Sequence, residues 1–219
     1  MVHLQEIQST IPAEVELVAV SKFHPAAAIR EAYAEGQRIF GESRVQELRE
    51  KQAELPADVQ WHFIGHLQPN KVKYIAPFVS LIHAVDSEKL LREIEKQGAR
   101  CGRVIDVLLE LHVAAEESKF GFTPEACEAF LSEGGWREMP HVRICGLMCM
   151  ATHTDDETRI RADFRLAHDC FKSYQQTFFA DAPYFCRRSW GMSDDYLIAI
   201  EEGATLVRIG TAIFGARSY

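Results

Sequence analysis

The sequence predicts an α/β protein, specifically a closed (β/α)8 barrel of the TIM type. Short β-rich segments recur eight times along the 219 residues, and amphipathic stretches with helix signals lie between them. Such alternation of strand and helix predicts a parallel sheet with helical crossovers. No low-complexity linker or shift in composition divides the chain, so we expect one domain covering residues 1–219.

The predicted strands are short runs of apolar, β-branched and aromatic residues. They cover residues 15–20, 38–42, 59–65, 80–86, 104–113, 143–150, 183–190 and 204–210. Eight strand–helix units fit a closed barrel better than an open doubly wound sheet, and 219 residues lies near the short end of the barrel's range. No G-x-G-x-x-G follows the first strand, which disfavours a dinucleotide-binding fold.

Capping residues predict where several helices begin and end. Pro25 and Ser87 each open an amphipathic stretch, and Thr123 can cap a helix whose first turn holds Pro124. The longest helical pattern, about residues 155–179, falls between the sixth and seventh predicted strands. Three glycines are expected to end helices: Gly36, Gly98 and Gly134.

The charge balance bounds the classes of partner. A formal net charge of -8 disfavours a general nucleic-acid or anionic-membrane surface, but it leaves room for a small anionic ligand. No apolar run approaches the ~18 residues of a membrane span. The first ten residues lack the basic start and apolar centre of a secretion signal. We therefore expect a cytoplasmic protein that binds neither nucleic acid nor membranes.

The cysteines and histidines do not form a recognisable metal motif. The six cysteines are scattered without a C-x-x-C pair, which is typical of reduced, apolar thiols. His62 and His66 lie four residues apart, a spacing that suits zinc on a helix. Because the residues around them alternate like a strand entering a loop, we expect no metal site.

Lys22 follows directly after an apolar run in "LVAVSKFHP". Its amine can reach water while its stem covers the strand end, and these nine residues alone favour that solvated interpretation. Alternatively, a partly desolvated lysine at the carboxyl end of a strand can lose its proton and attack an aldehyde to form a Schiff base.

Small-residue turns follow the last two predicted strands, where barrels of this kind often hold phosphate. Ser193 lies in "SWGMSDD" after the seventh strand, and Gly210 and Thr211 follow the eighth. Ser193 is expected to cap the helix after it, and such a helix start is also an anion site. Arg208 lies within the apolar eighth strand and must find an ion pair or a ligand.

Five motifs carry a family resemblance: "AVSKFHP", "FGESRVQE", "WHFIGHLQPNK", "GLMCMA" and "GMSDDYLIAIEEGATLVRIGTAIFG". From about Val15 to Gly215 the chain resembles the pyridoxal 5'-phosphate homeostasis protein (YggS or PROSC) family. The resemblance implies an alanine-racemase N-terminal-domain-like barrel that holds pyridoxal 5'-phosphate (PLP) as an aldimine on a lysine.

The family's cofactor contacts map onto residues of this chain. The resemblance implies that Lys22 forms the Schiff base, that Ser193, Gly210 and Thr211 grip the phosphate, and that Arg208 faces the pyridine nitrogen. Since guanidinium only donates hydrogen bonds, that nitrogen would stay unprotonated and the ring would be a weak electron sink.

Other positions are expected near the cofactor. His62 and His66 are expected to line the pocket from the third strand, and Met148 and Met150 from the sixth, with core packing as the favoured role of the methionines. Ser43 stands where the family usually has asparagine, so one longer-reaching contact with the cofactor is in doubt. Phe120, in a position where small residues are common, is expected to alter the pocket rim around Lys119.

The resemblance implies a PLP-binding protein that serves intracellular vitamin B6 homeostasis, with PLP-dependent apoenzymes as possible recipients and no reaction of its own. The alternative is an amino-acid racemase. Alanine racemase takes one base, a tyrosine, from an additional domain of the partner subunit, whereas this chain ends at Tyr219. We therefore expect a monomer in which proton removal relies on Lys22 alone. A third hypothesis is an aldolase that forms a Schiff base without a cofactor. Such an enzyme has no obvious use for Arg208 next to the two small-residue turns that are expected to bind phosphate.

Overall fold

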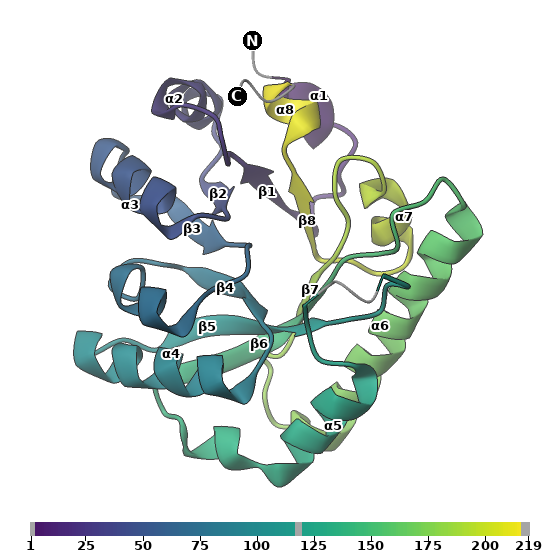
Figure 1. The fold of residues 1–219 in the computed structure, drawn as a ribbon. Coiled ribbons are helices and arrows are strands. Elements are labelled where there is room, and N and C mark those ends of the chain that lie inside the picture. The colour runs from purple at the N-terminus through teal and green to yellow at the C-terminus, as the bar shows by residue number, and fades with distance from the viewer. Residues whose placement is uncertain (1–2, 117–119, 216–219) are drawn as a thin grey trace.

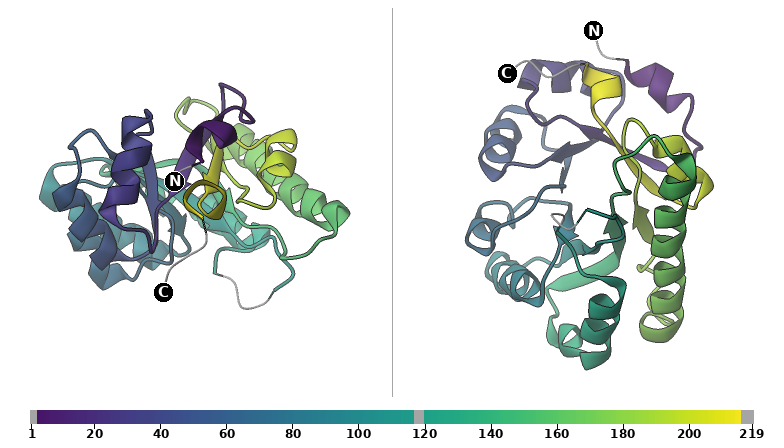
Figure 2. Two further views of the ribbon diagram at one scale, coloured as in Figure 1. Left: turned by 90° about the horizontal axis from the view of Figure 1, so that it is seen from above. Right: turned by 45° about the vertical axis from the view of Figure 1, so that its right-hand side comes forward.

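The eight strands of the computed structural model, which describes residues 3–116 and 120–215, form one closed parallel barrel in chain order. Helices surround the barrel on its outside (Figures 1 and 2). The strands are β1 (Glu16–Val20), β2 (Ile39–Glu42), β3 (Gln60–Phe63), β4 (Leu81–Val85), β5 (Ile105–Leu111), β6 (Val142–Cys149), β7 (Arg187–Ser189) and β8 (Leu206–Ile209). Each overlaps a predicted strand, so the predicted fold class is confirmed.

The helices fill the crossovers between strands, except after β3, where a 3-10 helix takes their place. They are α1 (Leu4–Gln8), α2 (Ala26–Ala34), α3 (Val45–Glu54), η1 (Pro69–Tyr74), α4 (Glu88–Cys101), α5 (Pro124–Glu133), η2 (Gly135–Glu138), α6 (Glu157–Phe178), α7 (Tyr196–Glu201) and α8 (Thr211–Phe214). In the described residues, no helix combines the length and apolar character needed to cross a membrane.

Most of the predicted caps are confirmed. The Ser87 hydroxyl accepts from the amide of Leu90, and Thr123 caps α5. The prediction that Gly98 ends α4 was wrong, because that helix continues to Cys101 and ends at Gly102, whose φ is 61°. Gly98 is instead needed for close packing, since a Cβ there would lie 2.9 Å from the backbone oxygen of Arg103.

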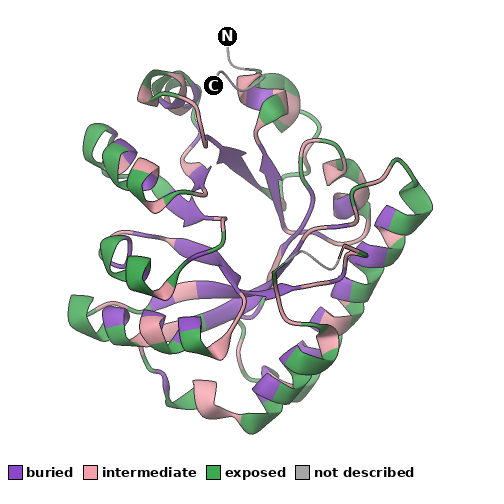
Figure 3. Cartoon of the chain, viewed as in Figure 1, coloured by how far each residue is buried: buried purple, intermediate pink, exposed green. Residues whose placement is uncertain are grey.

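Both apolar and polar side chains are buried among the strands of the barrel. An apolar cluster drawn from β1, β4, β5, β6 and β8 fills one part: Val18, Leu81, Ala84, Leu108, Cys145, Met148 and Leu206. Buried polar side chains near or just beyond the strands' carboxyl ends include Ser21, Glu42, His83, Glu110 and Arg208. Figure 3 shows the strands buried inside the ring of helices. The polar groups therefore lie at the end where barrel sites form.

We predict that Gly146→Ala destabilises the fold by about 3 kcal/mol. Gly146 has φ 151°, and a Cβ there would lie 1.8 Å from the backbone oxygen of Arg187 on the neighbouring strand β7. Chemical denaturation of the wild type and of Gly146→Ala measures the loss of stability. Gly135→Ala is the control, because the nearest atom to a Cβ at Gly135 is 3.6 Å away. An equal effect of the two substitutions would contradict this account of Gly146.

Candidate functional site

A pocket of about 300 Å³ opens at the carboxyl ends of β1, β7 and β8. It brings together five of the residues predicted from the sequence as cofactor contacts: Lys22, Ser193, Arg208, Gly210 and Thr211. The remaining lining residues are Val20, His24, Ile64, Met150, His153, Met192 and Asp194. Its volume is at the low end of the range of about 300–1,000 Å³ that is typical of small-molecule sites.

Lys22 reaches the pocket from a turn rather than from a strand. Strand β1 ends at Val20, and Lys22 is half-buried two residues later. Phe23, which follows it, has φ 67°, a left-handed conformation that is unfavourable for a bulky residue. The sharp turn directs the chain away from the barrel immediately after the lysine, and α2 begins at Ala26.

Arg208 is held from inside the barrel. It is 5% exposed, and its Nη1 donates to the carbonyl oxygen and to Oγ of Ser189, both at 2.6 Å. Its Nη2 donates to the carbonyl oxygen of Cys149 at 2.9 Å. Burial lowers the pKa of Arg208, and no carboxylate of the described residues lies within ion-pair distance. The guanidinium is therefore fixed by neutral acceptors while it also lines the pocket.

The two small-residue turns meet. Ser193 Oγ accepts a hydrogen bond of 3.3 Å from the backbone amide of Gly210. The prediction that Ser193 caps the following helix was wrong, because α7 begins at Tyr196 and Asp195 occupies the cap position. Position 210 has no room for a side chain, because a Cβ there would lie 3.0 Å from the carbonyl oxygen of Val20. The corner therefore packs β8 tightly against the end of β1.

A chain of buried side chains connects Arg208 to His62. His83 Nδ1 lies 2.9 Å from Ser189 Oγ, and His83 Nε2 lies 2.9 Å from His62 Nδ1. Ser189 Oγ accepts from Arg208, so its own proton is free to be donated to His83 Nδ1. His83 then carries its proton on Nε2 and donates it to His62 Nδ1. Burial lowers the pKa of His62 to about 3 and that of His83 well below its usual range. Both rings are neutral at physiological pH.

Three other predicted contacts lie elsewhere. His62 is 2% exposed and belongs to the chain behind Arg208, and Met148 is part of the apolar cluster inside the barrel, while Met150 lines the pocket. Ser43 lines a separate cavity of about 850 Å³, together with His66 and several basic residues. Direct contact of Ser43, His62 or Met148 with a cofactor stays a prediction.

Two histidines of the pocket wall were not selected from the sequence. His24 follows β1 and His153 follows β6, so the rule that sites form after strands could have found both. The ring of His24 packs tilted against Phe214, with 5.2 Å between centroids. Residue type alone does not separate these two from the other seven histidines, so only their position after a strand could have selected them.

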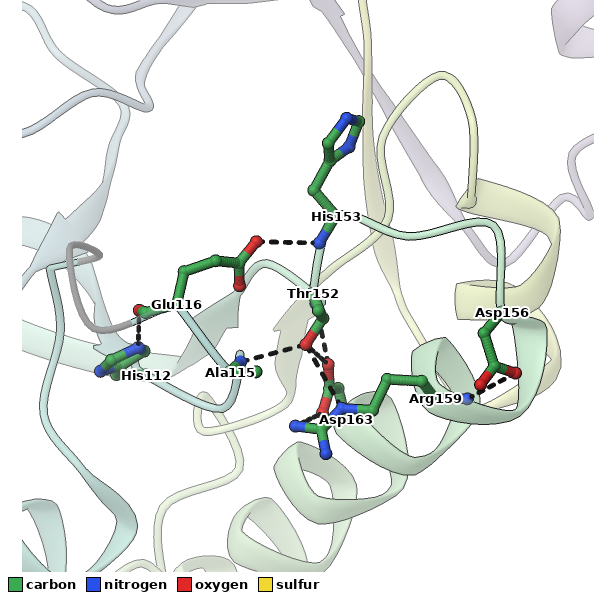
Figure 4. Close-up of polar contacts among 8 residues, drawn as sticks. All are labelled: His112, Ala115, Glu116, Thr152, His153, Asp156, Arg159 and Asp163. Carbon is green, nitrogen blue, oxygen red and sulfur yellow. Dashed lines mark hydrogen bonds and ion pairs between the residues drawn. The ribbon is translucent and has the colours of Figure 1, made fainter.

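Figure 4 shows how the loop that carries His153 is anchored. The backbone amide of His153 donates to Glu116 Oε1 at 3.0 Å, and Thr152 Oγ1 donates to Asp163 Oδ2 at 2.6 Å. Arg159 forms an ion pair of 2.9 Å with the buried Asp163 on α6. The His153 ring points away from this cluster (Figure 4). Lys119, expected at the pocket rim, lies outside the described residues, and Phe120 stacks on His66 at 4.0 Å.

Glu110, near the end of β5, is a buried carboxylic acid in the polar end of the barrel. Burial and the nearby negative charge of Asp86 raise its pKa to about 7, although Arg208 acts in the opposite direction. The Asp86 carboxylate pairs with His66 at 2.9 Å. Glu110 is therefore partly protonated near neutral pH.

Comparison with known proteins identifies the family. The profile of the family described as "Alanine racemase, N-terminal domain" matches residues 2–218. A pyridoxal phosphate homeostasis protein of Aquifex aeolicus is 40% identical over 205 residues, covering 93% of this chain and 88% of that protein. One of Pseudomonas aeruginosa is 42% identical over 210 residues, covering 95% of this chain and 87% of that protein. The chain belongs to the pyridoxal phosphate homeostasis protein family.

Solved structures of the family agree with this fold. PipY of Synechococcus elongatus, determined with PLP bound, is 39% identical and superposes with a TM-score of 0.86, covering 97% of this chain and 98% of that chain. The alanine racemase of Streptomyces lavendulae is 20% identical, with a TM-score of 0.75, and the match covers 97% of this chain and 56% of that chain. The second similarity shows the barrel fold alone.

We predict that the free energy of unfolding of Glu110→Gln, measured relative to the wild type, increases as the pH rises from 4.5 to about 7. Over that range the unfolded wild type loses the Glu110 proton while the folded protein keeps it, so folding becomes less favourable. Glutamine carries no such proton. The difference should reach about 3 kcal/mol, since one pKa unit corresponds to about 1.4 kcal/mol. Denaturant titrations at a series of pH values measure it, and a constant difference would contradict the raised pKa.

Proposed function

We propose that this protein binds PLP in the Lys22 pocket and takes part in intracellular PLP homeostasis without catalysing a reaction of its own. One observation carries the proposal: the closed barrel brings an amine, a guanidinium and two hydroxyl-bearing turns from β1, β7 and β8 into a single pocket. An aldehyde that also carries a phosphate and a ring nitrogen fits that set of groups. The presence of PLP in the PipY structure and the names of the relatives support the same ligand.

Lys22 would hold the cofactor covalently. Its Nζ attacks the aldehyde carbon, and loss of water leaves a carbon–nitrogen double bond, a Schiff base, in place of the carbonyl. The half-buried position of Lys22 in the turn after β1 supports this role, because it places the amine in the wall of the pocket.

The corner formed by Ser193, Gly210 and Thr211 would hold the phosphate. Two hydroxyl groups and backbone amides lie together there, and the hydrogen bond from Gly210 to Ser193 fixes the two turns relative to each other. A preformed corner of this kind binds an anion without first having to be ordered.

Arg208 would face the pyridine nitrogen of PLP. PLP, when bound, supplies an electron-withdrawing ring, which is strongest when that nitrogen is protonated. The Arg208 guanidinium can only donate, and Ser189 and Cys149 hold it in place. It therefore favours an unprotonated nitrogen and a weak electron sink, which suits holding PLP better than amino-acid chemistry.

An amino-acid racemase is the second candidate function. The placement of His24 and His153 on the pocket wall favours it, because an imidazole can exchange a proton with a bound amino acid. The weak electron sink opposite Arg208 opposes it, and so do the names of the relatives, which describe homeostasis proteins rather than enzymes.

We further propose that the chain acts as a cytoplasmic monomer and one PLP-binding unit, with PLP-dependent apoenzymes as recipients. The pocket residues of this chain already include the amine, the guanidinium and both hydroxyl-bearing turns that the proposed ligand needs. Release to an apoenzyme requires that the bond to the cofactor be reversible, as a Schiff base is.

We predict that Lys22→Ala abolishes the covalent adduct and leaves the fold intact, because the side chain is half-buried in a turn and its loss costs about 1 kcal/mol or less. Titration with PLP, reduction with borohydride and mass spectrometry of the peptides locate the adduct. Lys71→Ala, in the separate cavity, is the control and should keep it. An adduct that persists in Lys22→Ala, with a fold unchanged by circular dichroism, would mean that another lysine is the attachment site.

A further inference from the structure

The turn that carries Lys22 is fixed on both sides by a cluster of charged residues on β2 and α3, two of them buried and one half-buried. The cluster consists of Glu42, Glu47 and Lys51, and we refer to it as the turn clamp. Lys51 is 6% exposed, and its Nζ lies 2.7 Å from each of three oxygens: Glu42 Oε1, Glu47 Oε1 and the carbonyl oxygen of Ser21. An ammonium group has three protons, so all of them are used.

Ser21, the residue before Lys22, is held through each of its polar groups. Its Oγ donates to Glu42 Oε1 at 2.6 Å, and its amide donates to the carbonyl oxygen of Gly41 at 3.0 Å. Its carbonyl oxygen accepts from Lys51 and from the amide of His24. The backbone on the amino side of Lys22 therefore has a single arrangement.

Phe23, the residue after Lys22, is held by the same cluster. Its amide donates to Glu47 Oε1 at 2.7 Å, and the Arg44 guanidinium lies 4.6 Å from the centre of its ring. The left-handed conformation of Phe23 costs free energy and persists only when its surroundings impose it. The bond to Glu47 is a charge-assisted contact directed at the strained residue itself.

We propose that Glu47 and Lys51 are positioning residues for Lys22: by fixing Ser21 and Phe23, they keep the lysine aimed into the pocket before any ligand arrives. The proposal rests on the function proposed above and deepens it. Buried ion pairs are weak contributors to stability when compared with apolar packing, so a purely structural role is a poor account of this cluster. A turn held in advance lowers the conformational cost of forming the bond between Lys22 and PLP.

Glu47→Ala removes the acceptor for the Phe23 amide but leaves the buried pair of Lys51 and Glu42. We expect its PLP affinity to fall about tenfold, as for the loss of one hydrogen bond to a charged group. Glu47→Gln keeps an oxygen at the same position and should restore affinity to within about twofold of the wild type. Lys51→Met should lose at least as much PLP affinity as Glu47→Ala. If Lys51→Met does not fold, the affinity of Glu47→Ala alone tests the proposal.

The matched control lies at the other end of the same two strands. Gln37 is buried, and its amide donates to the carbonyl oxygens of Leu17 on β1 and Ile39 on β2 at 2.8 and 2.6 Å. Gln37→Leu should lower the melting temperature without changing PLP affinity. If Gln37→Leu weakens PLP binding as much as Glu47→Ala does at a similar melting temperature, the clamp is only structural and the proposal is wrong.

Hydrogen exchange of the Phe23 amide in PLP-free protein provides a second measurement that does not depend on the ligand. It should be about tenfold faster in Glu47→Ala than in the wild type, and near the wild-type rate in Glu47→Gln. If wild-type protein fails to load PLP on Lys22, the proposed function is wrong, while the exchange rates still decide whether the clamp fixes the turn. Unchanged protection of Phe23 in Glu47→Ala would overturn the positioning role.

Discussion

The parallel pairing of β1 with β8 closes the barrel and decides which side chains share the pocket. Its register sets Val18 beside Arg208, so the turn after β1 and the turn after β8 leave the barrel side by side. Lys22 and Thr211 lie at opposite ends of the chain, yet both line one small cavity as a result. Gly210 permits this contact, because any Cβ there would press on Val20. Without this closure, the amine and the guanidinium would have no common ligand.

Two polar networks support the two basic residues of the pocket, Arg208 and Lys22. Ser189, His83 and His62 continue inward from Arg208, whereas the turn clamp holds the backbone on either side of Lys22. Each network gives hydrogen-bond partners to buried polar groups, among them His83, Ser189 and Lys51, that would otherwise be costly to bury. The pocket therefore has fixed walls before a ligand binds. A pocket whose walls are fixed in advance binds a ligand at a lower conformational cost.

The sequence predicted the fold and the main groups of the site, but not how side chains leave the strand ends. Hydrophobic periodicity located the strands, and the carboxyl-end rule then grouped Lys22 with Arg208 and Thr211. The direction of a residue after a strand depends on the turn, and the positive φ of Phe23 leaves no mark in the residue type. Ser43 lines a separate cavity, and its contact with a cofactor stays a prediction. The turn clamp could not be predicted, because Glu47 and Lys51 look like ordinary charges of an amphipathic helix.

Exchange of α-protons tests most directly the claim that this site holds PLP without catalysis. The PLP-loaded protein would be incubated with D- and L-amino acids in deuterated water, and deuterium incorporation would be followed by mass spectrometry. The account predicts no exchange above that of free PLP, since a ring nitrogen held opposite Arg208, as proposed, would stay unprotonated and the ring would be a weak electron sink. Exchange well above that level, reduced by His24→Gln or His153→Gln, would contradict it and show an enzyme that uses those residues as bases.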